Sequence, residues 1–133
     1  MVFGTFDIVH AGHLSLFRQA RRYGKKLIVV VARDATAEKI KGKAPFHNEQ
    51  ERVALLKQLR NVDQVLLGDL RDAYKAIRRI KPDVIALGYD QEAFVDALNT
   101  EIREIHKPIR IIRLRPHQSV RYKTSEIRRF YAI

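Results

Sequence analysis

Short apolar segments alternate with longer segments of helical periodicity along this chain. Five segments are almost continuously apolar, as strands covered on both faces are: Met1–Phe3, Leu27–Ala32, Val62–Leu67, Val84–Leu87 and Ile109–Leu114. The first has only three residues, which indicates either a clipped strand or a natural start upstream of Met1. Strands that alternate with helices predict a parallel sheet wrapped by helices. We therefore expect one α/β domain over residues 1–133, with an open, parallel, five-stranded, Rossmann-like sheet and helices on both faces.

Start and stop signals define the helices between these strands. Helices are expected over 14–21, Val53–Leu59, Asp72–Ile80 and Gln91–Ile105. Gly24 follows the first of them, where a glycine is typical of a helix end. Asn48 and Glu51 have the spacing of a capping box that opens the second. Residues 35–47 are instead interpreted as a mobile basic loop, because lysines there are mixed with Gly42 and Pro45.

The composition excludes several classes of protein. The chain has 133 residues, of which 46% are hydrophobic and 31% charged, so it is neither disordered nor collagen-like. No apolar run approaches the roughly 20 residues of a membrane helix, and no export signal is recognisable at the N-terminus. Without cysteine there is no disulfide and no thiolate site. We expect a cytoplasmic protein that does not span a membrane.

An excess of basic residues indicates an anionic partner. The 26 Lys and Arg against 15 Asp and Glu give a net charge of +11, and the excess lies in residues 1–50 and 101–133. Two classes of protein fit, one that binds polyphosphates and one that binds nucleic acid. For a nucleic-acid-binding module the phosphate contacts would be Arg110, Arg113, Arg115, Arg121, Arg128 and Arg129. These arginines are not interleaved with an aromatic platform, so the nucleic-acid class is disfavoured.

The segment Gly4-Thr5-Phe6-Asp7-Ile8-Val9-His10-Ala11-Gly12-His13 runs from the first strand into the first helix. Ligands of open α/β sheets bind at such turns. His10 and His13 are three residues apart on one face of a helix start, where unpaired N–H groups attract phosphate. Gly12 would allow a phosphate to approach closely. This arrangement predicts a polyphosphate site without a P-loop. A zinc site is the alternative, but it has no obvious third ligand.

Gly4-Thr5-Phe6-Asp7 with His10-Ala11-Gly12-His13 resembles the HxGH signature of the cytidylyltransferase-like nucleotidyltransferases. The segment Tyr122–Arg128 is similar to the Ser/Thr-rich motif that opens the last helix of that family. The resemblance implies the HxGH nucleotidyltransferase fold and attack of a phosphate on the α-phosphorus of a nucleoside triphosphate, with release of pyrophosphate. It also implies Mg²⁺ held through the triphosphate rather than by fixed protein ligands, and a homodimer, for which Phe130 and Tyr131 are candidate contacts.

The resemblance also implies roles for individual residues. His10 and His13 would be catalytic donors to the triphosphate, and Lys39 or a neighbour on the basic loop would neutralise the β- and γ-phosphates. The expected nucleotide-binding residues are Gly4, Thr5, Phe6, His10, Gly12, His13, Gly88, Asp90, Tyr122, Thr124 and Ser125. The expected acceptor-binding residues are Asp7, Arg33 and Tyr89.

The substrate is indicated by a second resemblance. The stretch Leu87-Gly88-Tyr89-Asp90-Gln91, with Lys81–Ile85 before it, looks like the archaeal-type FAD synthases, which adenylylate FMN with ATP. Glycerol-3-phosphate cytidylyltransferases share the first two blocks, but their last motif begins Arg-Thr-Glu-Gly, which residues Gln118–Ser125 lack. We therefore expect adenylyl transfer from ATP to FMN, with cytidylyl transfer from CTP to glycerol 3-phosphate or a related phosphoalcohol as the alternative.

Overall fold

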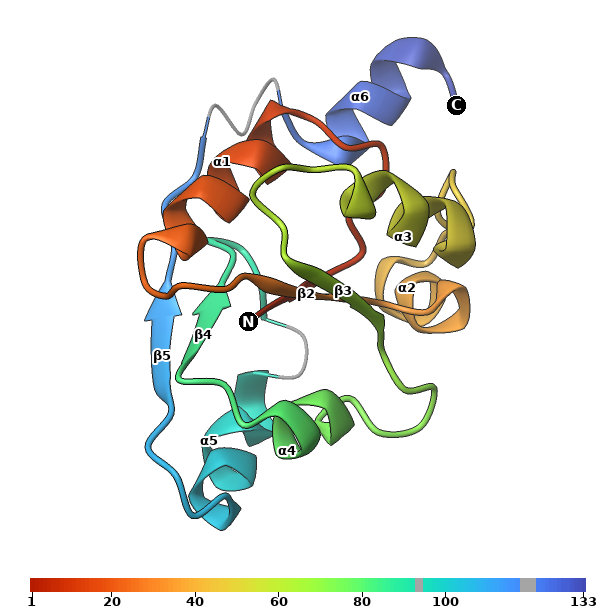
Figure 1. Cartoon of the computed structure of the whole chain (residues 1–133). Coiled ribbons are helices and arrows are strands. Elements are labelled where there is room, and N and C mark those ends of the chain that lie inside the picture. Colours follow the sequence, from red (N-terminus) through yellow and green to blue (C-terminus); the bar gives the residue numbers. More distant parts are fainter. Residues whose placement is uncertain (93–94, 118–121) are drawn as a thin grey trace.

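The computed structural model describes residues 1–92, 95–117 and 122–133 of the chain. It contains one parallel five-stranded sheet with the order β3-β2-β1-β4-β5 (Figure 1). The strands are β1 Val2–Gly4, β2 Ile28–Val31, β3 Gln64–Leu67, β4 Val84–Leu87 and β5 Arg110–Arg113. The predicted α/β fold with its five parallel strands is therefore confirmed.

The helices lie on both faces of the sheet (Figure 1). Helices α1 Ala11–Arg21 and α3 Glu49–Lys57 cover one face, on which Phe17 and Leu56 pack against the β-strand residue Val29. Helices α4 Lys75–Ile80 and α5 Val95–Glu104 cover the other face, on which Ile77 and Leu98 pack against Ile85. Burial on both faces explains why the strands are apolar at nearly every position.

The strand order reverses at β1, which pairs with β2 on one side and β4 on the other. The segment after β1 runs into α1 on one face, and the segment after β4 runs towards α5 on the other face. Because the chain leaves the two neighbouring strands in opposite directions, a crevice opens at their carboxyl ends. The two strands end at Gly4 and Leu87, so the HxGH turn and the Gly88 turn lie side by side there.

The prediction of a loop over residues 35–47 is wrong for its first half. Residues Asp34–Lys41 form helix α2, which has a buried alanine, Ala37, and ends at Gly42 with a φ of 72°. The Gly42 N–H donates to the Glu38 carbonyl oxygen at 2.7 Å, as in a glycine-terminated helix. The lysines of this segment are typical of a loop, but its Glu and Lys residues are also good helix formers, and Gly42 after them is a typical helix end.

Two other predicted helices are present, with starts that differ from the predicted ones. Asn48 and Glu51 form both bonds of the predicted capping box, at 2.9 and 3.0 Å, and open α3 four residues before the predicted start at Val53. Helix α5 starts at Val95, after a turn at Gly88–Gln91. Residues 93–94 of the helix predicted over Gln91–Ile105 lie outside the described residues.

Helix α6 Thr124–Tyr131 begins within the segment Tyr122–Arg128 that is expected to open the last helix, and it has no buried residue. In Figure 1 it lies beyond the start of α1, on the side of the sheet where the strands end. Phe130 and Tyr131 are 83% and 67% exposed, and their role in a homodimer stays a prediction. Among the described residues, no helix is long and apolar enough to cross a membrane.

Candidate active site

A pocket of about 950 Å³ opens at the carboxyl ends of β1 and β4. Its size lies near the upper end of the ~300–1,000 Å³ that small-molecule sites occupy. The predicted site residues in its lining are Thr5, Asp7, His10, Gly12, His13, Gly88, Tyr89, Asp90, Tyr122, Thr124 and Ser125. The fold thus brings together three segments that are far apart in sequence.

His10 and His13 form the floor of this pocket at the start of α1. His10 is the N-cap of the helix, and its Nδ1 accepts a hydrogen bond from the Gly12 N–H at 3.0 Å. The two imidazole rings stack with centroids 3.8 Å apart and an interplanar angle of 25°. The Phe6 ring packs edge-on against the His13 ring, with the two centroids 5.4 Å apart. The histidines therefore present two fixed rings to one ligand.

The hydrogen bonds of His10 define its tautomer. A backbone N–H can only donate, so Nδ1 of His10 carries no proton. The proton lies on Nε2, 3.3 Å from the Thr124 hydroxyl oxygen. That hydroxyl donates in turn to the Asp7 carbonyl oxygen at 3.0 Å, and its oxygen is free to accept from Nε2. Each donor in this series of three hydrogen bonds has one acceptor, and the series joins the start of α6 to the HxGH turn.

Both histidines are neutral at physiological pH. The pKa of His13 is lowered to about 3. Burial is the main cause, and the neighbouring His10 and Lys41 also contribute. Burial also lowers the pKa of His10. Nδ1 of His13 is buried and has no partner among the described residues, so a ligand reaches this ring through Nε2, which donates in the Nε2–H tautomer. The pair supplies directed N–H groups and not positive charge.

The low pKa of His13 predicts stability that is lost in acid. Between pH 6.5 and about 3 the unfolded chain protonates this histidine and the folded chain does not, so the free energy of unfolding falls as the pH falls. We expect His13→Asn to reduce the loss between pH 7 and pH 4 by about 3 kcal/mol. Urea unfolding at the two pH values measures this, with the exposed His106→Asn as matched control. An unchanged pH dependence in His13→Asn would contradict it.

The glycines of the motif make room for protein atoms. A Cβ on Gly12 would lie 2.6 Å from the Tyr122 carbonyl oxygen and 2.8 Å from the His10 ring, and a Cβ on Gly4 would lie 2.8 Å from the Phe6 ring. A side chain at position 12 would thus collide with protein atoms, while the expected close approach of a phosphate to Gly12 stays a prediction. Gly12 lets the segment before α6 close onto α1, and Gly4 lets Phe6 fold beneath the pocket.

Four predicted site residues do not line the pocket, namely Gly4, Phe6, Arg33 and Lys39. The Phe6 side chain is buried against Phe17, and the backbone turn at Phe6 has a φ of 53°. Lys39 lies exposed on α2, whereas Lys41, two residues later, lines the pocket. Partial burial lowers the pKa of Lys41, while Asp7 and Asp90 act to raise it.

Basic side chains surround the mouth of the pocket. Those in its lining are Lys41, Lys43, Arg115, Lys123, Arg128 and Arg129. The carboxylates in the lining, Asp7 and Asp90, are both engaged by the protein. Asp90 pairs with Lys123 at 3.3 Å, and the bond raises the pKa of Lys123. The pocket is therefore suited to a ligand with several negative charges.

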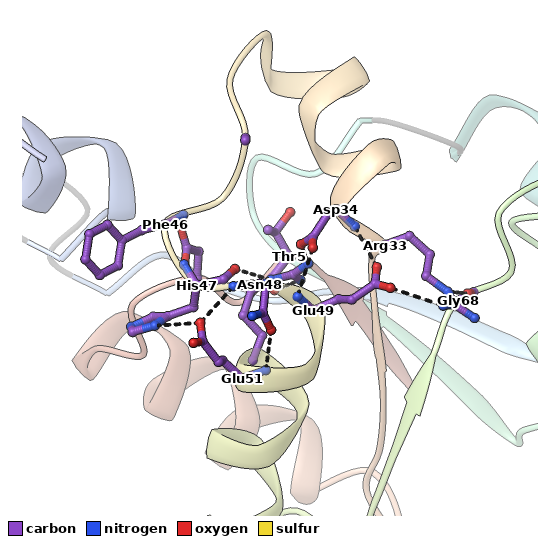
Figure 2. A network of polar contacts seen from close by, with 12 residues as sticks. Thr5, Arg33, Asp34, Phe46, His47, Asn48, Glu49, Glu51 and Gly68 are labelled. Atoms are coloured by element: carbon purple, nitrogen blue, oxygen red, sulfur yellow. Dashed lines mark hydrogen bonds and ion pairs between the residues drawn. The ribbon is translucent and has the colours of Figure 1, made fainter.

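A polar network behind the pocket was not predicted from the sequence (Figure 2). Arg33, expected to bind the acceptor, instead donates to the Gly68 carbonyl oxygen at 2.7 Å and pairs with Glu49 at 3.2 Å. Glu49 and Asp34 each accept from the other's backbone N–H, at 2.9 and 3.1 Å. These bonds fix the starts of α2 and α3 next to each other.

Arg52 is the centre of this network and is completely buried, with 0% of its surface exposed. Its guanidinium donates to the carbonyl oxygens of Thr5 and His47, at 2.7 and 3.1 Å, and to the Asp34 carboxylate at 2.7 Å. It thereby connects the β1–α1 turn with α2 and the segment before α3. No signal in the sequence indicated this role, because Arg52 lies before the helix predicted over Val53–Leu59 and arginine is normally exposed.

The turn after β4 is also held by an arginine. Arg113 of β5 donates to the carbonyl oxygens of Gly88 and Gln91, both at 2.8 Å. Tyr89 lies at the pocket edge and is 38% exposed. His117 and Tyr122 also line the pocket, and their rings stack with centroids 6.0 Å apart. Planar ligand groups would therefore meet aromatic rings at two places along the pocket.

Comparison with known proteins agrees with this geometry. Residues 1–130 match the cytidylyltransferase-like family. The FAD synthase of Thermoplasma volcanium is 36% identical over 97% of this chain and 90% of its own length. That of Pyrococcus horikoshii is 41% identical, over 96% of this chain and 87% of its own. A solved structure described as a lipopolysaccharide core biosynthesis protein from Thermoplasma volcanium covers 89% of this chain and 96% of its own, with a TM-score of 0.81 and 38% identity. The chain belongs to the cytidylyltransferase-like family and is a nucleotidyltransferase.

Proposed function

We propose that this enzyme transfers the adenylyl group of ATP to FMN and so forms FAD and pyrophosphate. The observation that carries the proposal is the His10–Thr124 contact, which joins the HxGH turn and the start of α6 in one basic pocket. The names of the relatives supply the substrate, since proteins 36% and 41% identical over nearly the whole chain are FAD synthases.

The reaction needs no covalent bond to the protein. A phosphate oxygen of FMN attacks the α-phosphorus of ATP, and the bond from that phosphorus to the oxygen bridging to the β-phosphate breaks. Pyrophosphate leaves with the electron pair. Catalysis of such a transfer consists of positioning the two phosphates and stabilising the charge that moves to the leaving group.

The residues of the pocket fit these two tasks. When ATP binds, the Nε2–H of His10 exchanges its 3.3 Å contact with Thr124 for a phosphate oxygen at the reacting centre, and His13 donates beside it. The start of α6 offers its backbone N–H groups and the Ser125 hydroxyl as further donors, since the Thr124 hydroxyl already donates to the Asp7 carbonyl oxygen. Lys41, with Lys43 beside it, takes the part first expected of Lys39 and neutralises the outer phosphates. Because both histidines are neutral, they stabilise developing charge without binding the ground state as strongly as cations would.

The divalent ion expected for this chemistry would be Mg²⁺ carried by the triphosphate. Within the described part of the chain no three His, Asp or Glu side chains are grouped to hold an ion. Asp7 accepts two backbone N–H bonds and Asp90 pairs with Lys123, so neither carboxylate is set aside for a metal. The donor set fits an ion that arrives with the nucleotide and does not fit a resident metal centre.

A crossed substrate assay tests the proposal. ATP and CTP are each combined with FMN and with glycerol 3-phosphate in the presence of magnesium, and products are identified by mass. We expect FAD from ATP and FMN at a rate at least tenfold above every other pair. CDP-glycerol as the main product would contradict the proposal and support the cytidylyltransferase alternative. No pyrophosphate release with any pair would contradict the proposal.

A further inference from the structure

Asp7 has a role that differs from the acceptor binding expected of it. Its side chain is 3% exposed, and both carboxylate oxygens accept backbone hydrogen bonds. Oδ2 accepts from the Phe46 N–H at 2.6 Å, and Oδ1 accepts from the His47 N–H at 3.0 Å. A buried carboxylate is stable only where such donors replace its water. The carboxylate is thus committed to the segment 42–47, which we name the 42–47 loop.

The 42–47 loop is held mainly by polar bonds. Phe46, its largest apolar side chain, is 51% exposed and anchors it little. Arg128 of α6 donates to the Ala44 carbonyl oxygen at 2.9 Å, and its guanidinium lies 3.7 Å from Asp7. Arg52 donates to the His47 carbonyl oxygen. The position of the loop therefore depends on a few charged groups, of which Asp7 and Arg52 are buried and Arg128 is partly buried. Asp7 makes the most bonds to loop N–H groups.

This loop follows directly on the end of α2 that carries Lys41, and it contains Lys43, so that both lysines face the pocket. The backbone of Asp7 also accepts the hydrogen bond of Thr124 at the start of α6. One residue of the HxGH turn therefore contacts two walls of the pocket, one through its carboxylate and the other through its carbonyl oxygen.

We propose that Asp7 is a positioning residue that fastens the 42–47 loop to the β1–α1 turn and so holds Lys41 and Lys43 over the phosphate site. The kinetic part of this proposal rests on the proposed function, whereas the structural part does not. The distinction allows the two to be tested separately, because the attachment of the loop can be measured in the ligand-free protein.

The variant that tests it is Asp7→Asn, which keeps the shape of the side chain. An amide has one accepting oxygen, and its NH₂ would face the second loop N–H. We expect hydrogen exchange at the Phe46 and His47 amides, followed by NMR, to accelerate about ten- to a hundredfold. Exchange at the core strand residues Val29 and Val30 should not change. The matched control is Asp83→Asn, an exposed carboxylate before β4 that pairs with Lys107 at 3.0 Å.

Three results would overturn the proposal. One is unchanged exchange at Phe46 and His47 in Asp7→Asn, and another is equal acceleration at the core amides, which would mean a general loss of stability. The third is measured in the wild-type protein, so it applies even if the variant does not fold. The Ala44 amide has no acceptor among the described residues, and we expect Phe46 and His47 to exchange more slowly than Ala44. Exchange at Phe46 and His47 as fast as at Ala44 would overturn the proposal.

The kinetic consequence is measured afterwards. With Lys41 and Lys43 displaced, we expect the KM for ATP of Asp7→Asn to rise about tenfold, more than kcat falls. An unchanged KM together with faster loop exchange would overturn the link between loop position and phosphate binding. Should the wild-type protein make no FAD, the exchange results still decide the structural part.

Discussion

His13→Ala and His10→Asn are each expected to lower kcat by two to three orders of magnitude while the fold is retained. Loss of one preorganised donor to a developing negative charge costs about 10²–10³ in rate. In the proposed mechanism each histidine supplies one such N–H, that of His10 after it leaves its contact with Thr124. Asparagine at position 10 keeps a side-chain oxygen that can cap α1, so His10→Asn separates the loss of the donor from the loss of the cap. Steady-state FAD formation under saturating ATP and FMN measures the effect.

The control for both histidine variants is His106→Ala, an exposed residue that follows α5 far from the pocket. It should retain full activity. Circular dichroism should give the same secondary structure content for all the variants. Turnover within about twofold of wild type in both His13→Ala and His10→Asn would remove the histidine pair from the mechanism.

Arg52→Met is expected to lower the free energy of unfolding by about 3 kcal/mol. Each carbonyl oxygen left without a donor costs about 1–3 kcal/mol, while water partly compensates the Asp34 carboxylate, whose side chain is 40% exposed. Methionine fills much of the volume, but the carbonyl oxygens of Thr5 and His47 then lose their donor. The Asp34 carboxylate loses its counter-charge and keeps only its bond from the Glu49 N–H. Urea denaturation at pH 7 measures the change.

Arg60→Met is the matched control, because Arg60 is exposed just after the end of α3. A surface substitution of this kind should change stability by no more than about 0.5 kcal/mol. Arg52→Lys keeps the charge but cannot form the fork of bonds to three partners, and it should fall between the two. Equal stability of Arg52→Met and Arg60→Met would show that the buried arginine contributes nothing to the fold.

The strands and the motif positions could be predicted because their signals are local. A strand buried on both faces must be apolar at nearly every residue, as β2 and β4 are. The capping box at Asn48 is a spacing of three residues that one helix turn explains. The pairing of His10 with His13 likewise follows from one turn of α1. Such features do not depend on the remainder of the fold.

The residues that were misplaced depend on contacts between distant segments. Whether Lys39 or Lys41 faces the pocket is decided by the phase of α2, a segment whose sequence pattern predicts a loop. Arg33 binds Glu49 and the Gly68 carbonyl oxygen. These partners come near it only because α2 packs beside α3 and the end of β3. The burial of Arg52 could not be read from its residue type, since arginine is normally exposed.

Helix α6 supplies part of the pocket without supplying any of the core. Neither hydrophobic cluster of the described residues extends beyond Leu114, and α6 is attached through Thr124, Arg128 and Lys123, all by polar contacts. In the described part of the chain, the pocket therefore has one wall that polar contacts alone hold against the rest of the domain. By thermodynamic linkage, a nucleotide that contacts both α6 and the HxGH turn stabilises this attachment, and the attachment in turn contributes to the affinity for the nucleotide.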